Sequence, residues 1–171
     1  MPLFVRKVAL SKWPGKGISL SDYPADAISD LKTSQNTLSF WFIDSLDDLK
    51  NVVIALATAP LVTRLEAMHL LWIEESIFYQ KSFSVRKDKK GSTAVTKYED
   101  THRDICDLTY TTIGTMAEIV ADAVHSRAYR TIPTPIVKEY VKTAYLEGDI
   151  ELSRCHQKLV DILRKFDGIS Q

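Results

Sequence analysis

The sequence is poor in the residues that nucleotide-binding and catalytic motifs require. It contains 6 glycines among 171 residues, so the glycine-rich loops that hold phosphate groups in many nucleotide-binding proteins are hard to place. It has no Walker loop, G-x-G-x-x-G fingerprint, G-x-S-x-G nucleophile motif or pair of C-x-x-C motifs. These absences count against a nucleotide-binding enzyme, and we expect no cofactor.

Cysteine, long apolar segments and an excess of one charge are also missing. The 2 cysteines, Cys106 and Cys155, make no disulfide framework, which favours a cytoplasmic protein with free thiols. There is no run of about 18 apolar residues, and residues 1–13 lack the apolar segment of a signal peptide, so we expect no membrane contact. Lys plus Arg equals Asp plus Glu at 22 each, which argues against a dedicated nucleic-acid-binding protein.

The residues that are present predict an α+β protein whose N-terminal part, residues 1–92, holds a small mixed α/β sheet. Alternating apolar residues and short apolar runs predict strands, whereas three- and four-residue spacings predict helices. The expected strands, about four in number, are 3–10, 37–43, 66–73 and 76–86. The two expected helices of this part are 21–32 and 45–56.

Residues 93–171 predict a helical half of about three helices. The first runs from about residue 98 to 129, the second from 134 to 148 and the third from 149 to about 166. The third has apolar residues spaced 3, 4, 3 and 4 apart, which predicts a seam that packs against another helix. The seam residues are Leu152, Cys155, Leu159, Ile162 and Phe166.

The stretch KYEDTHRDICDLTY, residues 97–110, is the part of the sequence that most resembles a catalytic or metal-binding site. On a helix, His102 lies about 200° from Asp104, which predicts that the two do not form an Asp–His site. Glu99, His102 and Cys106 do share a side and are weak candidates for metal ligands. The alternative is structural, with His102 bordering a core and Cys106 as a small buried residue. We favour this alternative and predict neither a metal site nor a catalytic residue.

Two further groups of residues carry weaker signals. A basic cluster could contact phosphate groups, although a solvated loop is the more common explanation. Its members are Lys81, Arg86, Lys87, Lys89 and Lys90. Arg64 and His69 resemble the Arg-x4-His spacing of the HEPN family of ribonucleases, but we favour the simpler explanation of a turn arginine and a strand histidine.

Aromatic residues are concentrated in LSFWFI and LLWI, which are most simply core strands. If helices cover only one face of the sheet, some of these side chains would be exposed and would need a partner. Tyr110, on the expected helix from residue 98, lies in a threonine-rich segment of intermediate polarity that suits a contact surface. The candidates for partner binding are therefore Trp41, Trp72, Phe78 and Tyr110.

The stretch DYPADAISDLKTSQNTLSFWFI, residues 22–43, resembles the small accessory, or middle, components of bacterial three-gene anti-phage systems of the Lamassu kind. These are encoded beside SMC-like ATPases and nuclease effectors. The resemblance implies a non-catalytic subunit that bridges or regulates an ATPase and a nuclease. It transfers no functional residue to this chain.

Three functions follow from these observations. The first is a non-catalytic cytoplasmic subunit that acts by protein–protein contact within a hetero-oligomer. The second is a small toxin-like nuclease or other hydrolase with His69, His102 or His156 as its acid–base group. The third is a module that contacts nucleic acid through the basic cluster, directly or as part of an assembly. We favour the first, because catalytic constellations are missing and amphipathic and aromatic surface is plentiful.

Overall fold

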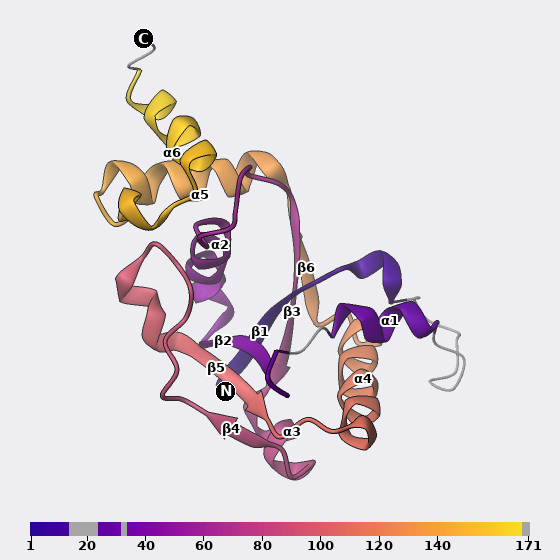
Figure 1. The fold of residues 1–171 in the computed structure, drawn as a ribbon. Coiled ribbons are helices and arrows are strands. Elements are labelled where there is room, and N and C mark those ends of the chain that lie inside the picture. Colours follow the sequence, from indigo (N-terminus) through magenta and orange to yellow (C-terminus); the bar gives the residue numbers. More distant parts are fainter. Residues whose placement is uncertain (14–23, 32–33, 169–171) are drawn as a thin grey trace.

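The alternating apolar residues of the N-terminus form a central strand of an antiparallel sheet in the computed structural model, which describes residues 1–13, 24–31 and 34–168. The described residues form one sheet with the order β4-β5-β2-β1-β3-β6 (Figure 1). Its strands are β1 (Leu3–Val8), β2 (Leu38–Ile43), β3 (Met68–Glu74), β4 (Ser84–Arg86), β5 (His102–Cys106) and β6 (Tyr129–Ile132). Every pair of neighbouring strands is antiparallel.

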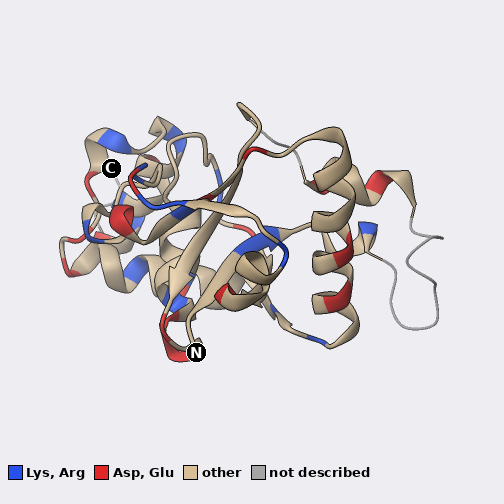
Figure 2. Ribbon diagram, turned by 90° about the horizontal axis from the view of Figure 1, so that it is seen from below, with Lys and Arg blue, Asp and Glu red and all other residues tan. Residues whose placement is uncertain are grey.

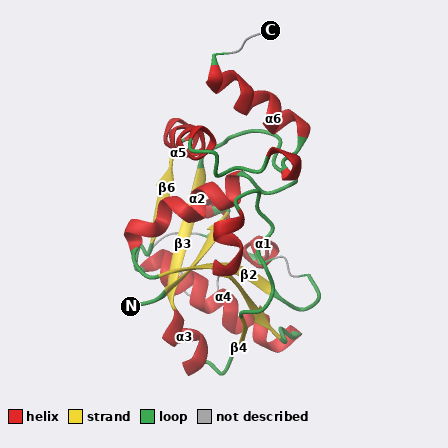
Figure 3. Cartoon of the chain, turned by 90° about the vertical axis from the view of Figure 1, so that its left-hand side faces the viewer, coloured by secondary structure: helices red, strands yellow, loops and turns green. Residues whose placement is uncertain are grey.

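Helices cover both faces of this sheet, so the molecule has three layers (Figure 3). On one side lie α2 (Leu49–Ala57), α5 (Thr134–Leu146) and α6 (Gln157–Arg164), which share one apolar cluster with that face, and α6 lies farthest from the sheet (Figure 3). The other face packs against α1 (Ala25–Asp30), α3 (Glu75–Gln80) and α4 (Tyr110–His125). Because side chains alternate along a strand, each inner strand supplies apolar residues to both layers.

An aromatic cluster fills the layer beneath α3 and α4. Phe78 of α3 has its ring centroid 5.2 Å from that of Phe4 and 5.3 Å from that of Phe40. All three side chains are fully buried. Their packing fixes α3, and with it the chain that leads from β3 to β4, against the centre of the sheet.

The α+β class expected from the sequence is confirmed. The strands expected at 3–10, 37–43 and 66–73 appear as β1, β2 and β3. The helices expected near 21–32, 45–56 and 134–148 appear as α1, α2 and α5. Part of the segment 22–43, residues 22–23 and 32–33, lies outside the described residues.

The helix expected from residue 98 to 129 was wrong. A 3₁₀ helix (Thr96–Thr101), β5, α4 and β6 take its place. Asp107 has a left-handed φ of +56°, which ends the strand, and Thr109 and Thr112 then make a reciprocal capping box that begins α4. Since β5 and β6 belong to the sheet, the C-terminal part is not purely helical, and the sheet joins residues from both sides of position 92.

Two other expected elements also differ from the structure. The strand expected at 76–86 is α3 followed by the short β4, because Phe78 turns into the aromatic cluster and Ser82 takes a left-handed φ of +59°. The helix expected from 149 begins only at Gln157, where the His156 side chain caps α6. Its seam residues still pack against the core on the α2–α5 side.

Within the described ranges, no helix is both long enough and apolar enough to cross a membrane.

Candidate functional site

Strand β5 brings together two residues that the helical interpretation had separated. His102 and Asp104 lie two positions apart, so on a strand they share a face. His102 Nε2 lies 3.6 Å from Asp104 Oδ1, and Ser39 Oγ of the neighbouring β2 donates a 2.9 Å hydrogen bond to the same oxygen. The expectation that His102 and Asp104 cannot meet was therefore wrong.

Asp104 is the most deeply buried acidic group of this region, with 0% of its surface exposed. Lys89 Nζ lies 3.4 Å from Asp104 Oδ2, which accepts no hydrogen bond from the described residues. A buried carboxylate is costly unless a cation compensates it. Lys89 supplies that compensation and thereby fixes its loop over β5.

His102 is held in one orientation. Its Nδ1 lies 3.0 Å from the backbone carbonyl oxygen of Lys89, and because a carbonyl only accepts, Nδ1 carries the proton and donates it. The indole of Trp41 packs edge-on at 5.7 Å between ring centroids. His102 is only 6% exposed, so His102 and Asp104 form a packing element without the open access that an acid–base catalyst needs.

Glu99 is engaged by cations. Arg154 donates a short hydrogen bond to Glu99 Oε1, and Lys90 Nζ lies 3.3 Å from Oε2. These contacts, the one from Arg154 first, lower the pKa of the Glu99 carboxyl. The contact with Arg154 ties the segment before β5 to the C-terminal helices.

The three weak metal candidates are not brought together as ligands. Glu99 binds Arg154, His102 binds the Lys89 carbonyl, and the Cys106 thiol lies 3.6 Å from the carbonyl oxygen of Asp104. Burial raises the pKa of the Cys106 thiol, which disfavours the thiolate that binds metals. In the part of the chain that the structure describes, no group of three His, Cys, Asp or Glu residues could hold a metal ion.

The basic cluster is largely paired with acids of the same protein. Four of its members form ion pairs: Arg86 with Asp88 at 3.8 Å, Lys87 with Glu75 at 3.5 Å, Lys89 with Asp104 at 3.4 Å and Lys90 with Glu99 at 3.3 Å. Lys81 lies apart, on the rim of a cavity described below. The loop therefore carries less free positive charge than its sequence indicates.

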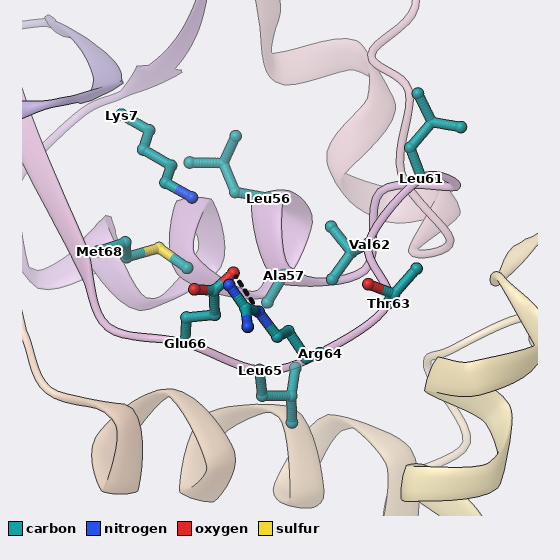
Figure 4. A pocket seen from close by; sticks show the side chains of 10 residues that line it. All are labelled: Lys7, Leu56, Ala57, Leu61, Val62, Thr63, Arg64, Leu65, Glu66 and Met68. Atoms are coloured by element: carbon teal, nitrogen blue, oxygen red, sulfur yellow. Dashed lines mark ion pairs between the residues drawn. The ribbon is translucent and has the colours of Figure 1, made fainter.

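The other candidate histidines have structural partners. His69 Nδ1 lies 2.9 Å from Thr131 Oγ1 on β6, and His156 Nδ1 accepts the backbone N–H of Lys158 at the start of α6. Arg64 pairs with Glu66 at 3.0 Å on the wall of a small pocket (Figure 4). Arg64 and His69 thus bind different groups, and this arrangement does not assemble the ribonuclease pair.

The four partner-binding candidates divide into two kinds. Phe78 is 0% exposed and Trp41 6% exposed, so both belong to the core and cannot present a contact surface. They are buried because helices cover both faces of the sheet, whereas exposure required one bare face. Tyr110 is 98% exposed at the start of α4, and Trp72 is half-buried near the end of β3, on the face covered by α2 and α5.

Trp72 lines a cavity of about 370 Å³ between the end of β3, α3 and α4, which we call the edge cavity. Its wall is mainly apolar: Leu3, Trp72, Ile77, Ile119, Ala123 and Ala128. Its polar rim consists of Glu74, Lys81, Asp122 and Ser126 together with backbone groups. A mainly apolar concavity with a few polar groups at its rim is typical of a binding site.

The edge cavity exists because β6 is shorter than β3. The last residue of β3 opposite β6 is Leu71, which faces Tyr129. One further bond joins the Trp72 N–H to the Ala128 carbonyl at 3.0 Å, but the Ala128 N–H turns back to Ala123 at the end of α4. The last residues of β3 therefore have no strand beside them on this side.

The backbone of β3 consequently presents hydrogen-bonding groups at the opening. Because the Trp72 N–H points toward β6, the Trp72 carbonyl points the same way, and strand alternation directs the Glu74 N–H there too. The Ala128 N–H, which would otherwise reach the Trp72 carbonyl, is bonded elsewhere. Apart from the aromatic residue Trp72, no feature of the sequence predicts this open edge.

Comparisons with known proteins add no further evidence about the site. No family model, curated protein or solved structure matches the chain.

Proposed function

We propose that the protein is a non-catalytic subunit that acts by binding another protein, with the edge cavity as its contact site. The observation that carries this proposal is the combination of an apolar cavity and an unpaired strand edge at the same place. Exposed apolar patches and open strand edges are each common sites of protein contact. Here both are formed around Trp72.

The histidines support this proposal indirectly. His69 and His156 have structural partners, and His102 is buried beside Asp104. None of the three combines a cleft, an acidic or arginine partner and access for substrate, which a hydrolase built on them requires. A binding role needs no such arrangement.

The resemblance of residues 22–43 to accessory components of Lamassu-like systems adds a class of partner to the proposal. On that basis the subunit bridges or regulates an SMC-like ATPase and a nuclease in anti-phage defence, as part of a cytoplasmic hetero-oligomer. The edge cavity is large enough to receive side chains of such a partner.

Size-exclusion chromatography tests the proposal. The protein is run alone and then mixed with the purified products of its neighbouring genes. We expect co-elution with at least one of them, and we expect Ser126→Trp, which places a bulky side chain at the exposed mouth of the edge cavity, to reduce it. A protein that elutes as an unchanged monomer with every neighbour contradicts the proposed function.

A further inference from the structure

We infer that the edge cavity receives an extended segment of the partner protein, which adds to β3 as a strand. The segment places a large apolar side chain against Trp72 and a Lys or Arg side chain beside Asp122. This inference rests on the proposed function and names the chemistry of the partner at that site.

The backbone of β3 favours an extended segment over a helix. The Trp72 carbonyl is an acceptor and the Glu74 N–H is a donor, and both face the opening beyond the last β6 bond. An added strand satisfies both groups with its own N–H and C=O. A helix has its backbone groups bonded internally and leaves both unsatisfied.

The wall of the cavity favours a large apolar side chain on that strand, packed against Trp72. Trp72 and Ile77 are half-buried, while Ile119 and Ala123 at the floor are almost fully buried. Trp72 lies on the face of the sheet covered by α2 and α5, whereas Ile119 and Ala123 lie on the face covered by α4. Because side chains alternate along the added strand, one of its residues faces Trp72 and the next faces α4, where Asp122 lies. Burial of a large apolar side chain then supplies the affinity that two backbone hydrogen bonds alone do not.

The charge of the rim favours a basic residue in the partner segment. The charged residues of the rim are two acids, Asp122 and Glu74, and one base, Lys81. Helix α4 carries Glu118 and Asp122 and has no Lys or Arg; the acidic residues of the molecule are coloured red in Figure 2. A Lys or Arg in the segment complements this rim, whereas an acidic segment is repelled.

The same charge argues against a second copy of this chain as the occupant. A two-fold contact brings each patch against its own equivalent. Asp122 and Glu74 of one copy would then face the acidic rim of the other, and like charges across an interface are unfavourable. We therefore expect the protein alone to remain monomeric.

A library of random 12-residue peptides displayed on phage tests the inference on the intact protein. We expect enriched sequences that combine a large apolar residue with Lys or Arg at an adjacent position, and few Asp or Glu. A synthetic peptide of the enriched sequence is then titrated against the protein by fluorescence anisotropy. Proline placed next to the apolar residue should abolish binding, because it removes a donor from the added strand.

Two charge reversals on one helix face provide the matched pair of variants. Asp122→Lys changes the rim, whereas Glu118→Lys makes the same change one turn away, outside the cavity lining. We expect Asp122→Lys to weaken peptide binding about tenfold or more and Glu118→Lys to weaken it less than about twofold. Both positions are exposed, so both variants should fold, which circular dichroism checks.

The outcomes separate the inference from the proposed function. If a gene neighbour co-elutes but no apolar–basic sequence is enriched, or Asp122→Lys binds the peptide as wild type does, the inference fails and the function stands. If the peptide binds at the cavity but no neighbour co-elutes, the site is real and the subunit role fails. If neither binds, both fail.

Discussion

The two edges of the sheet, which we call the β4 end and the β3–β6 end, differ in how they limit pairing with further strands. At the β4 end the strand is only three residues long, and charged residues follow it directly. At the β3–β6 end the shorter β6 leaves backbone groups of β3 beside an apolar cavity. Short, charged edge strands prevent pairing with other chains, whereas an open edge with apolar neighbours invites it. This contrast is why we propose the β3–β6 end as the contact site.

The charged β4 end also shows that charge density in the sequence is a poor guide to the positive charge that is free to bind a ligand. Every residue of the run RKDKK is charged, yet its basic residues are paired with acids within the protein. The edge cavity has only a few charged groups, and those are at its rim. Charges that hold a loop in place are less available to a ligand than charges without an internal partner.

The largest expected effect comes from α3, which connects the two ends. Phe78→Ala removes the ring that packs on Phe4 and Phe40, and we expect it to lower the free energy of unfolding by about 3–5 kcal/mol. Urea unfolding followed by circular dichroism measures this. Tyr110→Ala is the control, since its exposed ring should change stability by less than about 0.5 kcal/mol. Equal effects would mean that Phe78 is not a core residue.

Gly91→Ala probes the charged end alone. A Cβ at Gly91 would lie 2.5 Å from Trp41 Cη2 and 3.1 Å from His102 Cβ. We expect this overpacking to cost about 1–3 kcal/mol, measured by urea unfolding, while peptide binding at the edge cavity stays within about twofold of wild type. Loss of that binding in the folded variant would contradict the independence of the two ends.

Glu99→Gln tests the ion pairs that tie the charged end to the C-terminal helices. The pKa of Glu99 is lowered from its ordinary value of 4.5, first by the hydrogen bond from Arg154. A lowered folded-state pKa means that its stabilisation is complete above pH 4.5 and is lost as the pH falls through the folded-state pKa. We expect Glu99→Gln to be about 1–2 kcal/mol less stable at pH 7.

The pH dependence supplies the check on this prediction. In urea unfolding at pH 7, 5, 4 and 3, the difference between wild type and Glu99→Gln should be constant from pH 7 to 5 and shrink below pH 4.5. A difference that does not change with pH would show that Glu99 is not held as a carboxylate by Arg154.

The smallest expected effect concerns nucleic acid. Lys87 is paired with Glu75, so Lys87→Gln should change the affinity for single-stranded DNA, measured by fluorescence anisotropy at low salt, by less than about twofold. A direct phosphate contact would instead give a clear loss and a shallower dependence on salt. Such a result would restore the basic cluster as a nucleic-acid site and weaken the contrast between the two ends.

The parts of the fold that could be predicted from the sequence are those set by local pattern. The alternation in β1 and the apolar runs of β2 and β3 are sufficient to identify strands. Ser45 accepts a hydrogen bond from the Asp47 N–H just before α2, and Pro135 stands in the first turn of α5. In each case the signal lies within a few residues of the element.

The parts that could not be predicted depend on distant residues. β5 is a strand because β2 pairs with it, and the hydrogen bond from Ser39 to Asp104 spans 65 positions. Its apolar spacing fits a helix equally well, which is why His102 and Asp104 were separated. The edge cavity combines Leu3, Trp72 and Ala123, and only the surplus of aromatic residues pointed to Trp72.

Amide hydrogen exchange measured by NMR on the protein with and without the enriched peptide tests the central claim most directly. The account predicts that the Glu74 amide, which faces the opening of β3, exchanges about tenfold or more slowly with peptide bound. Amides of β4, residues 84–86, should not change. Unchanged exchange at Glu74 in a saturated complex, or protection that appears at β4 instead, would contradict strand addition at the edge cavity.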